Sequence, residues 1–282
     1  MTKFTKILVS ALCCTALAFG AAGCTGNGGV PPANEQVQRP DWSQEEGKVQ
    51  FQIGMWAGIP SVMGGNELTD EGFSAMYDLL AASGINMAQN GLTEMSREYN
   101  LRALAEAERV GIGQIIQDGE VTNYLLNLAD NPDYDHDAAV EWLKEHSEPY
   151  LAFDSFRGYF IADEPSRTAF DSYEAAIAVF NEALPDKIFY VNLFPDYATT
   201  AQLGGVTYVD YIEEFAEVCD LPYISYDYYI LRRDDRGDPY LRDTYLLNLD
   251  RVVRLAKENG RDMWTFGCTV GHYGGTIREI DR

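Results

Sequence analysis

Short apolar runs alternate along the chain with segments in which apolar residues recur at helical spacing. Seven such runs, each expected to be a strand, begin at Val49, Ile85, Ile112, Gly158, Lys187, Tyr223 and Met263. Helices are expected at about 70–83, 101–110, 136–146, 172–184, 211–218 and 244–259. The first helix has well-defined ends, because Thr69 can cap its first turn and Gly84 favours the left-handed conformation that ends a helix.

Repeated strand–helix units predict a parallel sheet whose strands are connected by helices. The chain lacks the glycine-rich phosphate loop of a dinucleotide-binding fold, which favours an α/β fold of the (β/α)8 TIM-barrel type over a doubly wound sheet. Seven strands are one fewer than a closed barrel needs, and residues 274–282 are expected to begin the seventh helix. We therefore predict a barrel that is C-terminally truncated after strand seven. An open α/β sheet that never closes is the alternative.

The N-terminal segment has the pattern of a processing signal rather than of a folded domain. Lys3 and Lys6 form a basic start, residues 7–19 are apolar, and small residues then precede Cys24. This arrangement resembles a bacterial lipoprotein signal, which implies cleavage before Cys24 and lipidation of that cysteine. An ordinary secretory signal with a chance cysteine is the alternative.

The resemblance divides the chain into a lipoprotein signal peptide at 1–23, a tether at 24–47 and a barrel domain at 48–282. The tether is rich in Gly, Pro, Asn, Gln and Glu, a composition typical of flexible linkers. We expect an extracytoplasmic protein that is lipid-anchored through Cys24 to the bacterial cell membrane or outer membrane. Processing would leave Cys219 and Cys268, which we predict to be free thiols.

The charge of the chain restricts its partners. A formal net charge of -23 at pH 7 disfavours nucleic acid and anionic membrane surfaces, and it fits neutral or cationic ligands. The three histidines are scattered and form no cluster with acidic residues at metal-ligand spacing. No Gly-x-Ser-x-Gly motif is present. We therefore expect no nucleic-acid partner, no metal and no other cofactor.

Polar and aromatic residues gather at the carboxyl ends of the predicted strands, which is where active sites of such barrels lie. Amides and carboxylates can bind sugar hydroxyls, and aromatic rings can stack on the apolar faces of pyranoses. The sequence therefore predicts a carbohydrate-binding cleft. Its expected substrate-binding residues are Trp56, Gln89, Asp163, Asn192, Tyr226, Tyr228 and His272.

The fourth predicted strand, "GYFIADEP", ends on Asp163, Glu164 and Pro165. In that position the motif resembles the acid/base strand of the large retaining clan of TIM-barrel glycoside hydrolases, and the chain looks like the "DEP" lipoproteins assigned to that superfamily. The resemblance implies that Glu164 is the general acid/base and that Asp163 contacts the substrate near the bond to be cleaved. An enclosed glutamate beside an ionised aspartate also has a raised pKa, as a general acid requires.

The second carboxylate that a glycosidase needs is not where the resemblance would place it. No acidic residue lies between Trp264 and Gly275, at the end of the seventh predicted strand, and Asp227 is the best remaining catalytic partner. A nucleophile in the C-terminal region expected to be missing is the alternative. The leading hypothesis is a surface glycoside hydrolase that acts on a neutral glycan with Glu164 and Asp227 as catalytic residues. The alternative is a lipoprotein on the same scaffold that binds glycan without cleaving it, and a transporter's solute-binding protein is a third, less supported hypothesis.

Overall fold

The computed structural model describes residues 51–63, 65–90, 95–233, 236, 238–267, 272–273 and 276–277. The chain divides into two compact units, Met1–Asn34 and Glu35–Arg282, and every described residue belongs to the second. The predicted signal peptide and tether, including Cys24, lie outside the described residues.

Seven parallel strands follow one another across the sheet in the order in which they occur in the chain. The first five are β1 (Gly54–Met55), β4 (Met87–Gln89), β5 (Gly113–Ile116), β6 (Phe156–Asp163) and β7 (Ile188–Asn192). A parallel bridge between Leu193 and Tyr226 joins β7 to β8 (Tyr223–Tyr228), which pairs with β11 (Asp262–Gly267). Sequential parallel order is that of a (β/α)8 barrel, so the predicted fold class is confirmed.

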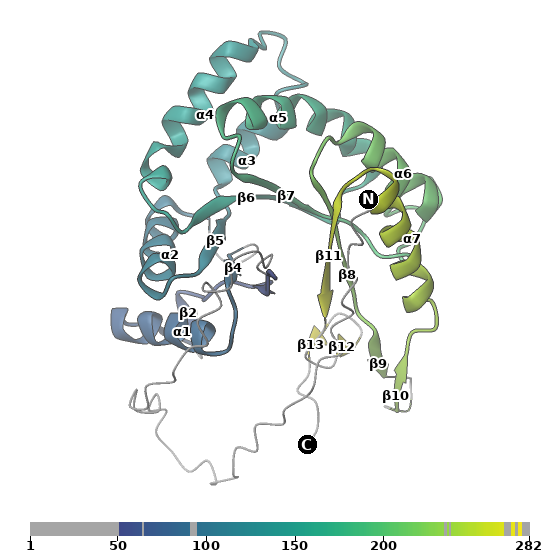
Figure 1. Ribbon diagram of the computed structural model, residues 1–282, viewed down its shortest axis with the longest axis horizontal. Helices are drawn as coiled ribbons and strands as arrows, with labels where there is room; N and C mark the ends of the chain where they lie inside the picture. Colours follow the sequence, from purple (N-terminus) through teal and green to yellow (C-terminus); the bar gives the residue numbers. More distant parts are fainter. Residues whose placement is uncertain are drawn as a thin grey trace, which may run out of the picture. The chain divides into compact units, whose positions relative to one another are not determined.

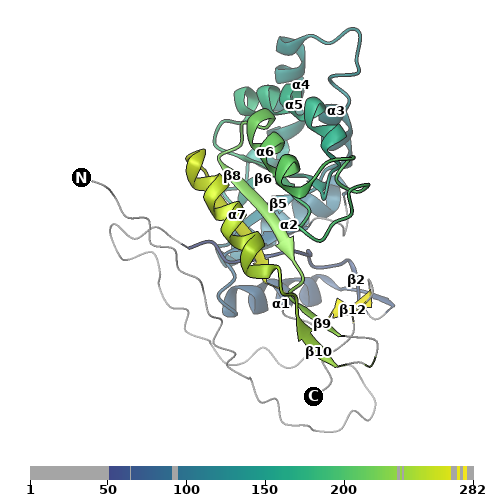
Figure 2. The same cartoon turned by 90° about the vertical axis from the view of Figure 1, so that its right-hand side faces the viewer.

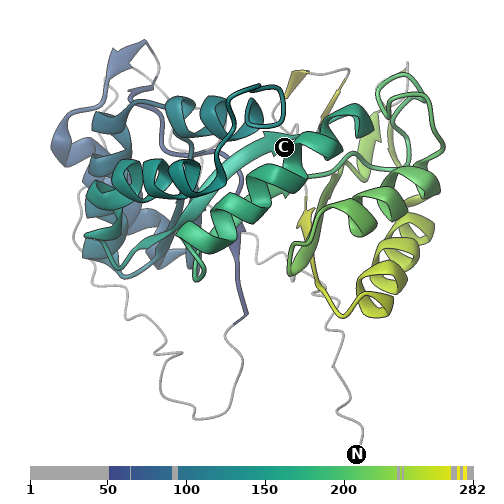
Figure 3. The same ribbon diagram turned by 90° about the horizontal axis from the view of Figure 1, so that it is seen from above.

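Helices connect these strands and lie along the outer side of the sheet (Figures 1 and 3). They are α1 (Asp70–Ala82), α2 (Arg97–Val110), α3 (Gly119–Leu126), α4 (His136–Leu151), α5 (Phe170–Ala183), α6 (Tyr208–Val218) and α7 (Tyr245–Glu258). A short 3-10 helix, Arg167–Ala169, precedes α5. The hydroxyl of Thr69 accepts a hydrogen bond from the Gly72 amide, which confirms Thr69 as the predicted N-cap of α1. Each helix in the described ranges is too short or too polar to cross a membrane.

Contacts inside the sheet bring its two end strands toward the same interior. Trp56, directly after β1, lies 4.8 Å from Phe266 on β11 and 5.7 Å from Phe160 on β6, measured between ring centroids. The first and last described strands of the sheet therefore share a common interior, as in a barrel, whereas the ends of an open sheet would lie far apart.

Three small antiparallel hairpins interrupt the strand–helix pattern. They are β2 (Val62–Met63) with β3 (Asn66–Glu67), β9 (Leu231–Arg233) with β10 (Pro239–Leu241), and β12 (His272–Tyr273) with β13 (Thr276–Ile277). The expected start of a helix near residue 274 is therefore wrong, because Thr276 and Ile277 are in a strand. The sequence Gly274-Gly275 stands between β12 and β13, and a Gly-Gly pair favours a tight hairpin turn.

Of the two cysteines left after the predicted processing, one is described. Cys219 is free and completely buried, as expected, and burial raises the pKa of its thiol to about 12. Cys268 lies outside the described residues. Cys219 is therefore an apolar core residue rather than a reactive thiol.

Candidate active site

Glu164 follows β6 directly and has an unusual backbone conformation. Its φ of 47° is the one positive φ among the described residues other than glycine. Its amide donates a hydrogen bond of 2.8 Å to the Asn192 carbonyl at the end of β7. A left-handed conformation costs free energy for a residue with a Cβ, and such strain often occurs at functional sites.

The loop after Glu164 is held in place by α6. The hydroxyl of Tyr211 donates to the Pro165 carbonyl at 2.8 Å. The Arg167 guanidinium binds one oxygen of Glu214 through two nitrogens, at 3.0 and 2.6 Å. These contacts fix the loop on both sides of Ser166, and they stabilise the strained backbone of Glu164.

Asn192 occupies the centre of a hydrogen-bonded cluster at the carboxyl ends of β6, β7 and β8. Its side-chain nitrogen donates to Asp163 at 3.2 Å and to Asp227 at 3.1 Å. Its side-chain oxygen accepts from the Ser225 hydroxyl at 3.2 Å, which fixes the orientation of the amide. Ser225 in turn contacts the Tyr190 hydroxyl at 2.8 Å. The amide therefore holds two carboxylates from different strands toward each other.

The side chains of Glu164 and Asp227 are hydrogen-bonded to each other, so one of the two carboxyls holds a proton. Burial is the largest effect on Glu164, and the Asp227 and Asp163 charges add to it, raising its pKa to about 8. Burial likewise raises the pKa of Asp163 to about 6, although the hydrogen bond from Asn192 opposes it. Burial raises the pKa of Asp227, while hydrogen bonds from Asn192 and Glu164 lower it. The shared proton therefore resides mainly on Glu164 at neutral pH.

A cavity of about 350 Å³ opens beside Glu164. Its walls combine apolar, aromatic and polar groups from the segments after β6, β7 and β8. The lining residues are Glu164, Phe194, Pro195, Tyr197, Ala198, Gln202, Tyr229 and Arg232. The volume is at the lower end of the roughly 300–1,000 Å³ that is usual for small-molecule sites.

The structure brings four of the predicted site residues together: Asp163, Glu164, Asn192 and Asp227. It places Tyr226 and Tyr228 on the other face of β8. Tyr226 is buried beside Asn248 of α7, and the Tyr228 ring lies 5.2 Å from Tyr245 of α7. Side chains alternate between faces along a strand, so Ser225 and Asp227 face the cluster while these two tyrosines face the helix layer.

The remaining predicted residues do not line the cavity either. Trp56 packs in the interior against Phe160 and Phe266. Gln89 is buried at the end of β4, and its amide nitrogen has no hydrogen-bond partner within the described part of the chain. His272 belongs to β12, but its side chain lies outside the described part of the chain.

Several cavity residues were not among the sequence-predicted candidates, notably Tyr197 and Arg232. The Tyr197 hydroxyl accepts a hydrogen bond from the Tyr229 amide at 3.2 Å, and the Arg242 guanidinium stacks 3.6 Å from the centre of the Tyr197 ring. Both candidates lie several residues beyond a strand end, where no periodic pattern marks them. What could have indicated them is their position: Tyr197 follows β7, which carries Asn192, and Arg232 follows β8, which carries Asp227. Loops after the strands of a barrel commonly line its active site.

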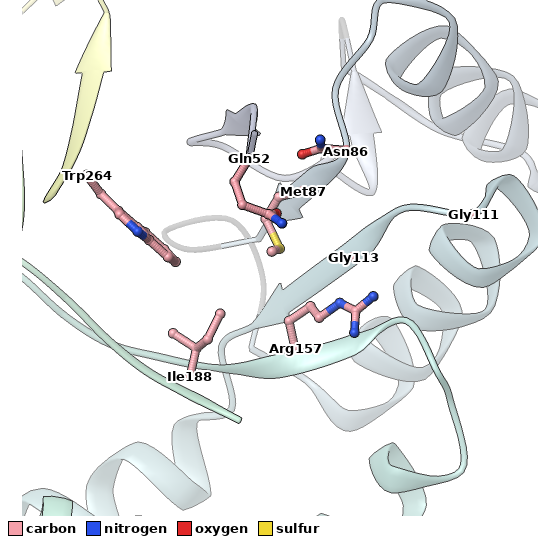
Figure 4. A pocket seen from close by; sticks show the side chains of 8 residues that line it. All are labelled: Gln52, Asn86, Met87, Gly111, Gly113, Arg157, Ile188 and Trp264. Atoms are coloured by element: carbon pink, nitrogen blue, oxygen red, sulfur yellow. The ribbon is translucent and has the colours of Figure 1, made fainter. Parts of the chain in front are cut away.

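A second cavity of about 420 Å³ lies at the opposite, amino-terminal ends of the strands. Figure 4 shows Trp264 on one side of it, Gln52 and Met87 on the other, and Arg157 beside Ile188. The other lining residues are Asn86, Gly111 and Gly113. No carboxylate is among its lining residues. Among the described residues, no group of three or more His, Cys, Asp and Glu side chains is arranged to hold a metal ion.

No protein-family model matches the chain, and no curated protein matches it. Among solved structures, a candidate alpha-L-fucosidase from Bacteroides thetaiotaomicron is 14% identical with a TM-score of 0.49, over 80% of this chain and 79% of that one. A citrate synthase variant is 12% identical with a TM-score of 0.37, over 68% and 71% of the two chains. A hyperthermophilic endo-beta-1,4-glucanase is 15% identical with a TM-score of 0.35, over 77% and 89%. Similarities this low assign no activity.

Proposed function

We propose that the protein is a glycan-acting hydrolase in which Glu164 is the general acid. The observation that supports this most is the hydrogen-bonded Glu164–Asp227 pair beside the cavity, with the pKa of Glu164 raised to about 8. A carboxyl group that stays protonated at neutral pH can give its proton to a leaving alcohol, which water alone does poorly. The position at the carboxyl ends of parallel strands is where barrel enzymes place such groups.

The proposed reaction cleaves the bond between the anomeric carbon and the glycosidic oxygen. Glu164 gives its proton to that oxygen as the bond breaks, so that the leaving sugar departs as an alcohol. Water adds to the anomeric carbon, and its proton returns to the carboxylate pair, which restores the starting state. Asp163 is half-buried beside the pair and would bind a sugar hydroxyl, while the buried Asn192 holds Asp163 and Asp227 in place.

One feature favours a second candidate, a surface protein that binds glycan without cleaving it. The two carboxyls of a retaining glycosidase are about 5–5.5 Å apart and those of an inverting one about 6.5–9.5 Å. Glu164 and Asp227 are hydrogen-bonded to each other, which leaves no room between them for the water that an inverting enzyme holds there. Catalysis therefore requires that a bound substrate break the hydrogen bond between the two carboxyls and separate them. Glycan binding alone requires no such separation.

The comparison of wild type with Glu164→Gln tests catalysis. On substrates with poorly acidic leaving alcohols, turnover is expected to fall by about 10²- to 10⁴-fold, because general acid catalysis contributes about that much. On aryl glycosides with highly acidic leaving phenols the loss is expected to be smaller, because those leaving groups need little protonation. Glu141→Gln is the matched control, since Glu141 is exposed on α4 and pairs only with Lys144 among the described residues. Glycan binding without any turnover that depends on Glu164 would establish the binding protein instead.

We also propose that Cys24 carries a lipid that anchors the protein outside the cytoplasm. The proposal is supported by the basic start, the short apolar run and the small residues before Cys24. In cells fed a labelled fatty acid, wild type is expected to incorporate label and partition into detergent, and Cys24→Ser to do neither. Equal partitioning of the two proteins would refute the anchor.

A further inference from the structure

Arg232 faces the same cavity as Glu164 but comes from a different element. It lies on β9, which continues the chain beyond the carboxyl end of β8 (Figure 2). β9 pairs with β10 so that Arg232 stands opposite Tyr240. The hairpin therefore places a guanidinium at the cavity that contains the proposed acid.

Within the described residues Arg232 has no anionic partner. Its Nε atom is buried and makes no hydrogen bond, and no ion pair with a described carboxylate involves it. By contrast, Arg167 and Arg109 are each paired with carboxylates. A buried guanidinium nitrogen without an acceptor costs free energy, so the site is suited to a ligand that supplies one.

The cavity itself supplies no neutralising charge. Glu164 is the single carboxyl among its eight lining residues, and it is mostly protonated at neutral pH because its pKa is about 8. The other walls are apolar or aromatic side chains and the Gln202 amide. Arg232 therefore meets no ionised carboxylate among the residues that line the cavity.

We propose that Arg232 binds the carboxylate of a uronic acid, and that the substrate is an acidic glycan whose uronic acid residue occupies this cavity. The proposal rests on the glycan-acting function above and specifies its substrate class. The planar guanidinium fork matches a carboxylate with two parallel hydrogen bonds, and Tyr197 and Tyr229 contribute aromatic side chains to the lining of the same cavity.

This substrate differs from the neutral glycan that the net charge of -23 suggests. Net charge acts at long range and is screened over about 8 Å at physiological ionic strength. The choice between neutral and acidic sugars is made at contact, where a single guanidinium outweighs distant surface charges.

The test compares three oligosaccharides that differ at one residue: a hexuronic acid, its methyl ester and the matched neutral hexose. The methyl ester preserves the size of the uronate and removes its charge. Wild type is expected to prefer the uronate over the ester by about tenfold to a hundredfold in kcat/KM, the usual range for a charge-assisted hydrogen bond. Arg232→Gln is expected to reduce this preference to about one. Arg157→Gln, the same substitution in the other cavity, is expected to leave it unchanged.

Two results would overturn the proposal: a wild type that does not prefer the uronate, or an Arg232→Gln variant that keeps the wild-type preference. Arg232→Lys retains the charge but loses the planar fork, so its preference for the uronate is expected to be intermediate. If Arg232→Gln folds poorly, the Lys variant tests the role of Arg232 in its place. If no glycan is turned over, the hydrolase proposal fails by itself. Calorimetric binding of the uronate and its ester to wild type and Arg232→Gln then still decides the role of Arg232.

Discussion

The cavity at the carboxyl ends of the strands, about 350 Å³, is lined by Glu164, whose carboxyl is hydrogen-bonded to Asp227. The cavity at the amino ends, about 420 Å³, has no carboxylate among its lining residues. The two cavities are similar in size, and each is bordered by an arginine. What differs is how their polar groups are used. At the carboxyl ends they are bound to one another and their pKa values are shifted.

At the amino ends the polar groups bind the backbone instead. The Asn86 side chain accepts from the Ile53 amide and donates to the Phe51 carbonyl, each at 2.8 Å. These contacts of Asn86 fix the chain where it enters the first strand. The size of the two cavities therefore does not indicate which one is the candidate active site, whereas the hydrogen-bonded carboxyls do. The carboxyl ends are expected to govern turnover and the amino ends to govern stability, as is general in barrels.

The largest effect is expected from Gly158→Ala, near the amino end of β6. Gly158 has a φ of 143°, and a Cβ added there would lie 2.1 Å from the Ile188 carbonyl oxygen on β7. Since backbone of a neighbouring strand cannot move aside, we expect a loss of more than about 4 kcal/mol of stability or no folded protein. Soluble yield and urea unfolding followed by circular dichroism measure this. Gly267→Ala is the control, because no atom lies within 4 Å of an added Cβ on that strand glycine.

Asp227→Asn is expected to have the next largest effect, and on turnover rather than on folding. The variant loses the charge that helps keep the proton on Glu164, so the pKa of Glu164 falls from about 8 toward its ordinary value of 4.5. Burial still raises this pKa, so turnover is expected to drop by about tenfold for each unit by which the pKa of Glu164 falls below the working pH, because the acid is then increasingly ionised. The alkaline limb of the pH–rate profile is expected to move to lower pH. A profile that keeps its wild-type alkaline limb would show that Asp227 does not tune Glu164.

The contrast between the two ends also shows what the sequence could reveal. The seven parallel strands and six of the helices follow from apolar runs and caps such as Thr69. The helix α3 was not predicted because it spans only 8 residues and its N-cap, Asp118, follows closely after β5. Strands of two or three residues, as in the hairpin that places Arg232, have no periodicity to detect.

The site could be predicted where the argument depended on strand ends alone. That rule correctly gathers Asp163, Glu164, Asn192 and Asp227, because parallel strands end at one edge. It cannot separate residues on opposite faces of the same strand, which is why it also includes Tyr226. Nor can it give the positive φ of Glu164 or its hydrogen bond with Asp227.

The pH dependence of stability is expected to show a smaller effect from the same carboxyls. The pKa of Asp163 rises from 3.8 to about 6 and that of Glu164 from 4.5 to about 8 on folding. Between pH 4 and 8 the folded state therefore holds protons that the unfolded chain has lost, and stability falls as pH rises through this window. The decline of the thermal midpoint from pH 5 to pH 8 is expected to be steeper in wild type than in Glu164→Gln. Equal slopes would mean that the pKa of Glu164 is not raised by folding.

The smallest effect is expected from Asn86→Ala at the amino ends, compared with Asn192→Ala at the carboxyl ends. Asn86→Ala removes two hydrogen bonds to partly exposed backbone groups, so the free energy of unfolding is expected to fall by about 1 kcal/mol. Turnover is expected to stay within about twofold of wild type, because no atom of Asn86 contacts the carboxyl cluster. Asn192→Ala removes the amide that holds Asp163 and Asp227, so its main expected effect is on turnover and on the pH–rate profile. Urea unfolding and steady-state kinetics on both variants measure the two effects, and a large loss of turnover in Asn86→Ala would contradict the division of roles between the two ends.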